Sequence, residues 1–337
     1  MTSVFVYSWA GLAALLSAIF VVVLLEPARR FDLIDHPVGR KNHGAPTPLV
    51  GGLAIFLSML VTLGLAGLLG GQSSSLWLAI FATVAIGVAD DAHEIGYRSK
   101  FFAQLIAALL IVSGTTIHVL HFGDIFAVGD FPLDKWSYLV TVIAIIGLMN
   151  AINMIDGVDG LAGTQVLIPL LVFAWVALGS GDLASGLEIM ILAGAVAGFL
   201  IFNLRSPWQR QARIFLGDTG GLLLGLLLAW YSIKLAGGEK APLRPITAVW
   251  ILAVPLLDMG AVMLLRMRQR KSPFQPDRQH LHYILLDAGY STSQVVLMMG
   301  TVAVAFATVA LLCETRQVPE FVMFGAFLGL LLVYWRV

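Results

Sequence analysis

The sequence is poor in charge and almost free of cysteine. Only 12% of the 337 residues are Asp, Glu, Lys or Arg, and they balance to a formal net charge of zero. Without a basic surplus there is no electrostatic field to attract nucleic acid, so we expect no nucleic-acid partner. The single cysteine, Cys313, excludes a disulfide within the chain. It lies in an apolar segment, where a structural thiol is the usual interpretation.

Apolar residues dominate the chain instead. They make up 59% of it, and the mean hydropathy is +0.90, which is typical of a polytopic membrane protein. We expect an all-α membrane protein with a single domain over residues 1–337. Eleven apolar stretches are long enough, or nearly so, to cross about 30 Å of hydrocarbon, and they cover residues 4–25, 48–69, 75–89, 102–119, 137–153, 161–179, 184–203, 219–235, 247–265, 292–313 and 319–336. The third is short and the fifth and eighth are about minimal, so ten spans remain open.

Lysine and arginine residues orient this arrangement. With eleven spans and the N-terminus outside, the inner connections and the C-terminal end hold fifteen Lys and Arg, and the outer connections hold five. Inner loops of membrane proteins carry the excess of positive charge. The sequence therefore predicts that the N-terminus lies outside and the C-terminus in the cytoplasm.

Five aspartates stand at the ends of apolar stretches that this topology places on the inner face. Asp90 and Asp91 end the third stretch, and the other three lie in Asn153-Met-Ile-Asp156-Gly-Val-Asp159-Gly and Gly217-Asp218-Thr-Gly. Carboxylates at membrane depth are costly and are a functional-site hypothesis by default. A helix end, a turn and an N-cap would explain each motif alone. Their convergence on one face predicts a metal and phosphate site.

Two histidines follow the ninth stretch, in Asp277-Arg-Gln-His280-Leu-His282. Side chains two apart do not share a helix face, and no cysteine or third histidine completes a zinc set. In a loop, His280 and His282 would bind phosphate or sugar hydroxyls, with Arg278 adding positive charge.

Two further residues have open interpretations. Lys41 precedes the second stretch and suits phosphate as a point charge, although the positive-inside bias explains it equally well. Asp258 lies inside the ninth stretch beside Pro255 and requires a polar partner there. Whether Asp258 is structural or catalytic stays open.

These motifs, in this order, resemble those of the polyprenyl-phosphate N-acetylhexosamine-1-phosphate transferases, and the last resembles the undecaprenyl-phosphate N-acetylglucosamine-1-phosphate transferase branch. The resemblance covers nearly the whole chain and rests on Lys41 with Pro48–Gly52, on Asp90-Asp91, and on the segments Asn150–Gly163, Phe215–Gly220 and Ser272–His282. Tyr283 departs from the usual His-x-His-His pattern, which puts the role of that third imidazole in doubt.

The resemblance implies eleven spans, a bacterial inner-membrane location, an active site on the cytoplasmic face and dependence on Mg²⁺ or Mn²⁺. It implies transfer of N-acetylglucosamine 1-phosphate from UDP-GlcNAc to undecaprenyl phosphate, with release of UMP, as the first step of a surface polysaccharide. Such displacement needs positioning and charge neutralisation more than covalent help. By resemblance, Asp218 and Asn153 hold the metal, and Asp90 and Asp91 lie by the lipid phosphate as catalytic residues. The remaining assignments are to substrate binding, for Lys41, Asp156, Asp159, Arg278, His280 and His282.

Other interpretations remain. Another UDP-N-acetylhexosamine would use the same chemistry, and the sequence leaves a homodimer open. An ion-coupled transporter shares this composition but places its acids near the bilayer midplane. A CDP-alcohol phosphotransferase requires an arginine after Asp159-Gly-Leu-Ala that this chain lacks. An intramembrane aspartyl protease requires a second, mid-span aspartate after a tyrosine, which is also missing.

Overall fold

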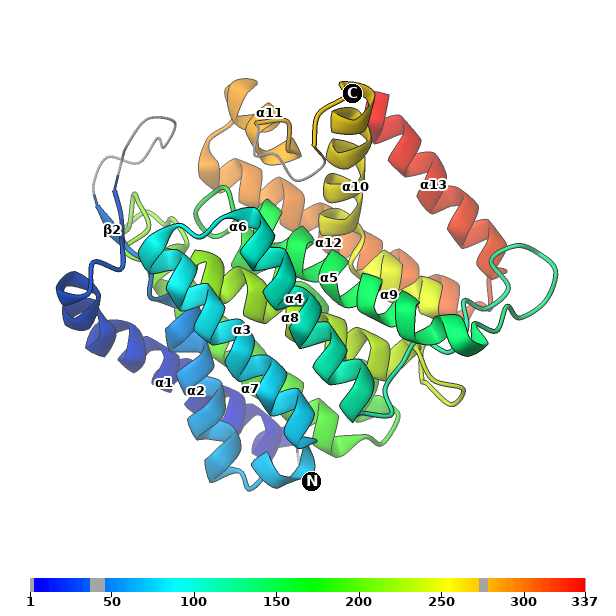
Figure 1. Cartoon of the computed structure of the whole chain (residues 1–337), viewed down its shortest axis with the longest axis horizontal. Coiled ribbons are helices and arrows are strands. Elements are labelled where there is room, and N and C mark those ends of the chain that lie inside the picture. Colours follow the sequence, from blue (N-terminus) through cyan, green and yellow to red (C-terminus); the bar gives the residue numbers. More distant parts are fainter. Residues whose placement is uncertain (1–2, 37–45, 273–277, 337) are drawn as a thin grey trace.

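The chain folds into a bundle of helices, and its computed structural model describes residues 3–36, 46–272 and 278–336. Figure 1 shows the helices packed side by side, with the two termini at opposite sides of the molecule. The helices are α1 (Ser3–Arg30), α2 (Gly51–Leu65), η1 (Leu69–Gly71), α3 (Ser74–His93), α4 (Tyr97–Gly114), η2 (Asp134–Trp136), α5 (Ser137–Ile155), α6 (Leu161–Gly179), α7 (Leu183–Asn203), α8 (Gly217–Ala236), α9 (Pro245–Ile251), α10 (Ala253–Arg268), α11 (Leu281–Asp287), α12 (Thr292–Thr315) and α13 (Glu320–Arg336). Strands β1 (Ile34–Asp35) and β2 (Thr47–Pro48) form a short antiparallel pair.

The all-α membrane fold is confirmed, but the count of eleven spans is not. Among the described residues, seven helices are long and apolar enough to cross a membrane, or eight if α9 and α10 form one span broken by an 84° bend. Every predicted apolar stretch nevertheless forms a helix or this bent pair. Three helices are too short or too polar to count as membrane spans. Helix α2 has only 15 residues and α13 only 17, while the first turn of α4 contains the charged residues Arg98 and Lys100.

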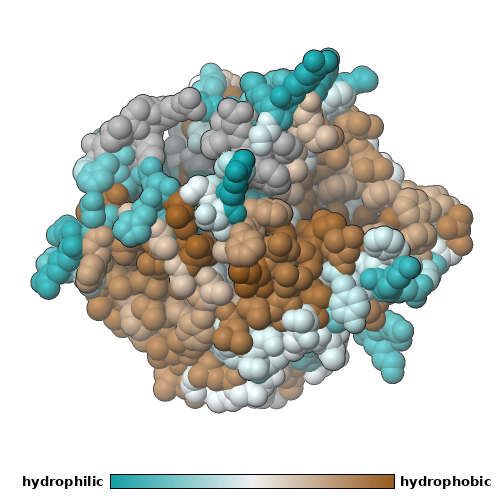
Figure 2. Space-filling view, in the orientation of Figure 1, coloured by the Kyte–Doolittle hydropathy of each residue, from teal (hydrophilic) through white to brown (hydrophobic). Residues whose placement is uncertain are grey.

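The outer surface of the bundle is hydrophobic. Figure 2 shows apolar residues over the middle of one face, with hydrophilic residues gathered towards its edges. Large side chains such as Leu297, Val304 and Leu332 are more than half exposed. An apolar surface this extensive matches a lipid environment, because water would make it an aggregation site.

Helix α8 lies at the centre of the bundle. It is apolar on nearly all sides, and 17 of its residues are buried, as expected of a helix surrounded by others. Glycines on its neighbours allow close approach to its first turn. A Cβ atom added to Gly52 of α2 would overlap the backbone of Gly220, and one added to Gly87 of α3 would overlap the backbone of Thr219. The sequence therefore fixes the position of this helix end by leaving out side chains.

The segment before α2 and the segment before α8 pair through their backbones. Gly51 N–H donates to Phe215 C=O at 3.0 Å, Gly52 N–H donates to Leu216 C=O at 2.9 Å, and Phe215 N–H donates to Pro48 C=O at 2.9 Å. Two motifs more than 160 residues apart in the sequence are thus joined directly at the start of α8.

Replacement of Gly87 by alanine tests this close packing. We expect Gly87→Ala to lower the free energy of unfolding by about 1–3 kcal/mol, the usual cost of overpacking, because the new methyl group would meet the backbone of Thr219. The matched control is Gly147→Ala in α5, where an added Cβ meets nothing within 4 Å and alanine should raise stability by about 0.5–1 kcal/mol. Thermal unfolding of both variants in detergent is the measurement. Equal stability of the two variants would contradict the packing argument.

Candidate active site

Asp91 closes the first turn of α8. Its Oδ1 accepts a hydrogen bond from the Asp218 N–H at 2.7 Å, and its Oδ2 accepts from the Thr219 N–H at 3.2 Å and the Thr219 hydroxyl at 2.6 Å. The free N–H groups and the dipole of a helix N-terminus favour a negative charge there. Gly217 adopts a φ of +72°, a conformation that favours glycine, directly beside this carboxylate. Both oxygens of Asp91 therefore hold α8 in place.

Asp218, on the same turn, lies at the centre of the polar cluster. Its Oδ1 accepts from the Asn153 side-chain amide of α5 at 2.7 Å. The same oxygen lies 3.0 Å from the Lys100 Nζ of α4, and this amino group also contacts the carboxylate of Asp90. Asp90 is only 2% exposed. Lys100 thus neutralises part of the charge of two carboxylates that would otherwise repel each other in a desolvated position.

Asp156 follows the last residue of α5 and faces the same cluster. Its side chain is exposed to solvent. Desolvation by the surrounding protein mass raises the pKa of Asp156 to about 7, and the charges of Asp218, Asp91 and Asp159 act in the same direction. The carboxyl of Asp156 therefore keeps its proton more readily than a free aspartate does.

Asp159 turns away from this cluster towards α7 and the segment that follows it. Its Oδ2 accepts from Arg205 Nε at 2.7 Å and from the Ala212 N–H at 3.2 Å. The next residue, Gly160, has a φ of +83°, and its N–H donates to the Asn203 side chain at 2.8 Å. These contacts fasten the loop between α5 and α6 to the end of α7. The predicted substrate role of Asp159 stays a prediction.

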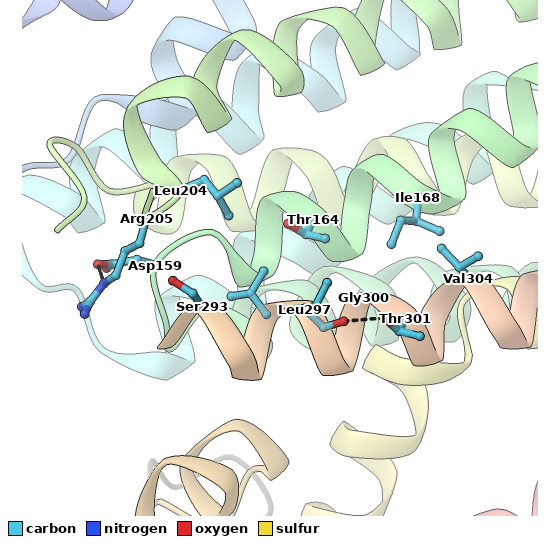
Figure 3. A pocket seen from close by; sticks show the side chains of 11 residues that line it. Asp159, Thr164, Ile168, Leu204, Arg205, Ser293, Leu297, Gly300, Thr301 and Val304 are labelled. Carbon is cyan, nitrogen blue, oxygen red and sulfur yellow. Dashed lines mark hydrogen bonds and ion pairs between the residues drawn. The ribbon is translucent and has the colours of Figure 1, made fainter. Parts of the chain in front are cut away.

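A groove begins at the Asp159–Arg205 pair and runs between α6 and α12. Figure 3 shows the two charged side chains turned towards each other at one end, while Ile168, Leu297 and Val304 line the groove further along. Its volume is about 590 Å³. The hydroxyls of Thr164 and Thr301 donate to carbonyls of their own helices, Gly160 C=O and Leu297 C=O, at 2.7 and 2.8 Å. The walls are therefore apolar towards the groove.

The two histidines lie beside the α5–α6 loop and are both buried. His280 binds the buried Asp258 of α10, with its Nδ1 2.6 Å from Asp258 Oδ2. His282, in α11, stacks on the His280 ring at a centroid distance of 5.5 Å. A Cβ atom added to Gly157 would overlap the His282 ring. His282 therefore contacts the α5–α6 loop directly, and because this loop carries Asp156 and Asp159 it is called the acidic loop below. Burial is the main reason that the pKa of His282 is lowered to about 4, which keeps the ring neutral at physiological pH.

Arg278 and Lys41 are the two remaining residues that the sequence assigns to substrate binding. Arg278 places its guanidinium 4.8 Å from the centre of the Tyr283 ring and donates to Asp287 at 3.2 Å. It is a surface contact of α11 in this structure. Lys41 lies outside the described residues.

The polar cluster fits a hard divalent cation. Among residues 3–36, 46–272 and 278–336, no three His, Cys, Asp or Glu side chains are grouped closely enough to hold a metal by themselves. Mg²⁺ is usually bound through one or two carboxylates together with substrate phosphates and water, so a full protein cage is not needed. Asp218 and Asn153 offer hard oxygen atoms, and Asp156 adds a negative charge at the same place.

Sequence reasoning missed Lys100, Arg205 and the partners of Asp258. In the sequence, Lys100 stands out only as one of the positive charges that orient the membrane topology. A signal was present: only the short segment 94–96 separates α3 from α4, so a lysine in the first turn of α4 must lie near the carboxylates that end α3. No comparable signal linked Asp159 to Arg205, 46 residues later.

The chain resembles known proteins over most of its length. The model for glycosyl transferase family 4 matches residues 73–236. The undecaprenyl-phosphate alpha-N-acetylglucosaminyl 1-phosphate transferase of Haemophilus influenzae is 32% identical over 330 residues, covering 96% of this chain and 93% of the relative. Proteins of the same name from Salmonella typhimurium and Escherichia coli K12 are 30% and 29% identical, each over 95% of this chain and 87% of the relative.

Replacement of Lys100 tests the charge balance of the cluster. We expect Lys100→Met to lower stability by about 3–5 kcal/mol, the cost of leaving buried charges uncompensated. Lys100→Arg keeps the charge and should be less destabilising. The control is Lys135→Met in η2, a lysine far from the cluster in the sequence. Thermal unfolding of the three variants is the measurement, and wild-type stability of Lys100→Met would exclude the pairing.

Proposed function

Because the chain belongs to glycosyl transferase family 4, we propose that it transfers N-acetylglucosamine 1-phosphate from UDP-GlcNAc to undecaprenyl phosphate. The observation that carries this proposal is the gathering of Asp90, Asp91, Asp156 and Asp218 with Asn153 and Lys100 around the first turn of α8. The named relatives, which match this chain over nearly its whole length, act on undecaprenyl phosphate according to their names.

The reaction exchanges one phosphoanhydride bond for another. An oxygen of the lipid phosphate attacks the β-phosphorus of UDP-GlcNAc, and the bond from that phosphorus to the bridging oxygen breaks. UMP leaves with this oxygen, and the product is undecaprenyl-pyrophosphoryl-GlcNAc. The acceptor phosphate has a second pKa near 6, so it is largely ionised at neutral pH and needs little help from a general base.

The residues of the site supply positioning and charge. Asp218 and Asn153 would hold Mg²⁺ or Mn²⁺, which when bound neutralises the pyrophosphate of the donor. Asp91 fixes the turn that carries Asp218, because both of its oxygens bind that turn. Lys100 keeps Asp90 and Asp218 together and adds a positive charge where phosphate oxygens would lie. The expected contact of Asp90 with the acceptor stays a prediction, since its carboxylate is buried beside Lys100.

The apolar surroundings suit an acceptor carried on a hydrocarbon chain. The groove between α6 and α12 begins at Asp159, in the loop that also carries Asp156, and its walls are apolar. It runs from Ser293 to Val304 of α12, a distance of about 16 Å at the rise of an α-helix. A groove of this length takes only the first part of a polyprenyl chain, and the remainder would lie among membrane lipids.

The proposal includes the membrane topology. The chain forms one domain that crosses the bacterial inner membrane eleven times, with the N-terminus in the periplasm and the C-terminus and active site on the cytoplasmic side. Support comes from the excess of Lys and Arg on the inner connections and from the separation of the two termini (Figure 1). The product would begin a surface polysaccharide of the O-antigen, enterobacterial-common-antigen or teichoic-acid type.

Transfer of label tests the proposed activity. Purified protein with UDP-GlcNAc labelled in the sugar, undecaprenyl phosphate and Mg²⁺ should yield label in the organic phase and release UMP. Asp218→Asn should lower the rate about a hundredfold or more, as the loss of a central electrostatic contact does. Asp182→Asn is the control, because Asp182 also lies at a helix N-terminus and accepts from the Ser185 N–H of α7. Label from another UDP-N-acetylhexosamine only would correct the sugar, and no transfer from any donor by folded protein would refute the proposal.

The raised pKa of Asp156 predicts a link between pH and metal binding. With a pKa of about 7, Asp156 is mostly protonated at pH 6 and mostly ionised at pH 8, so the site gains negative charge as pH rises. Mn²⁺ binding, followed by electron paramagnetic resonance without the acceptor lipid, should strengthen about tenfold from pH 6 to pH 8. Asp156→Asn should bind Mn²⁺ more weakly with a flatter pH dependence. A dependence unchanged by this substitution would assign the titration to another group.

A further inference from the structure

Asp258 is the centre of a buried polar cluster that joins three helices. It lies on α10 and is 2% exposed. Its Oδ1 accepts from the Leu281 N–H of α11 at 2.9 Å and from the hydroxyl of Tyr334 on α13. Its Oδ2 faces His280 Nδ1 at 2.6 Å. One carboxylate thus accepts three hydrogen bonds and fastens α11 to the end of the bundle, where Figure 1 shows α10, α11 and the C-terminal end of α13 near one another.

These contacts fix the proton of His280. The Asp258 carboxylate can only accept, so His280 Nδ1 carries hydrogen. On the other side of the ring, His280 Nε2 lies 3.4 Å from Arg266 Nη2. A guanidinium can only donate, so Nε2 accepts and carries no hydrogen. Both ring nitrogens of His280 are therefore used within the protein, and the ring is held in one tautomer and one orientation.

His282 differs from His280 in that its ring nitrogens have no hydrogen-bond partner in the described part of the chain. It is fully buried. Its ring is nearly parallel to that of His280, at 9°, and rests against Gly157, next to Asp156. Buried polar atoms without partners are uncommon in folded proteins and call for a specific explanation. A ligand at the acidic loop would provide the missing partner.

We propose that Asp258, Arg266 and Tyr334 are positioning residues that hold His280 rigidly, so that His282 is presented to the nucleotide-sugar donor at the acidic loop. This inference rests on the proposed function and deepens it. Asp258 fixes His280, and the His280 ring supports the His282 ring. The two ring nitrogens of His282 then offer one hydrogen-bond donor and one hydrogen-bond acceptor to the nucleotide sugar. Because His282 lies against Gly157, next to Asp156, the cluster acts on the nucleotide sugar and not on the lipid phosphate.

The natural alternative is that the cluster only anchors α13. A partly buried polar cluster elsewhere in the chain anchors helices in this way: Glu314 of α12 accepts from Thr247 of α9 and from Arg244, which also donates to carbonyls of Cys313 and Val318. It lies at the other end of the bent pair α9–α10 from Arg266. Glu314→Gln is therefore a control for the loss of one hydrogen-bonded carboxylate between helices.

The test compares Asp258→Asn and Tyr334→Phe with Glu314→Gln. An amide at position 258 offers a single acceptor oxygen to three donors, so His280 should lose its fixed tautomer. Binding of UDP-GlcNAc, measured by titration calorimetry in the presence of Mg²⁺, should weaken about tenfold in Asp258→Asn, as expected for the loss of a hydrogen bond to a charged group. Tyr334→Phe should weaken it less. In turnover assays KM for UDP-GlcNAc should rise, while KM for undecaprenyl phosphate stays unchanged.

A spectroscopic measurement separates this inference from the proposed function. In protein labelled with ¹⁵N-histidine, with His280 assigned through His280→Gln, the wild type should show hydrogen on Nδ1 and none on Nε2. Asp258→Asn should change that pattern, and Glu314→Gln should not. UDP-GlcNAc binding that weakens equally in Asp258→Asn and Glu314→Gln, or a wild-type His280 with hydrogen on Nε2, would overturn the positioning role. If the donor binds as predicted but no sugar phosphate is transferred, the proposed function fails and the positioning role stands.

Discussion

The site depends on one constraint, which is that the N-terminus of α8 ends inside the bundle. Free N–H groups buried without acceptors are costly, so a partner must lie directly in front of them. Asp91 fills that position and accepts from two backbone N–H groups and one hydroxyl. The helices around it approach closely only because Gly52 and Gly87 carry no side chains. Once α8 is fixed in this way, Asp218 on its first turn can point only towards α4 and α5, where Lys100 and Asn153 meet it.

The charge of the cluster follows from this arrangement. Asp90, Asp91, Asp156 and Asp218 lie close enough to influence one another, and in the described part of the site Lys100 is the cation that contacts two of them. The helix dipole of α8 offsets part of the charge of Asp91. A surplus of negative charge remains, and it would favour a divalent cation at this place. Without that cation the same carboxylates would repel a pyrophosphate.

Much of the fold, and part of the site, could be predicted from the sequence. Hydrophobic length alone located every helix except the short η1, η2 and α11, and the membrane-end acids pointed to the loop of Asp156 and the turn of Asp218. Hydrophobicity does not predict the bend at Leu252, because the α9–α10 pair is uniformly apolar up to Asp258. The sequence also does not reveal which groups each aspartate binds. Asp91 and Asp159 look alike in the sequence, yet one accepts from a helix terminus and the other from Arg205. That difference is set by packing between segments far apart in the chain.

The placement of α11 explains why a buried carboxylate is retained at Asp258. Removing a carboxylate and a guanidinium from water costs several kcal/mol for each ion, and well-packed apolar side chains of similar volume would often be at least as stable. The value of the cluster therefore lies in the geometry that it imposes. An apolar contact would allow α11 to slide or rotate, because dispersion forces have little directional preference. Three hydrogen bonds to one carboxylate leave a single orientation for His280. A seven-residue helix such as α11 is marginally stable alone, so its place beside the acidic loop must come from these tertiary contacts.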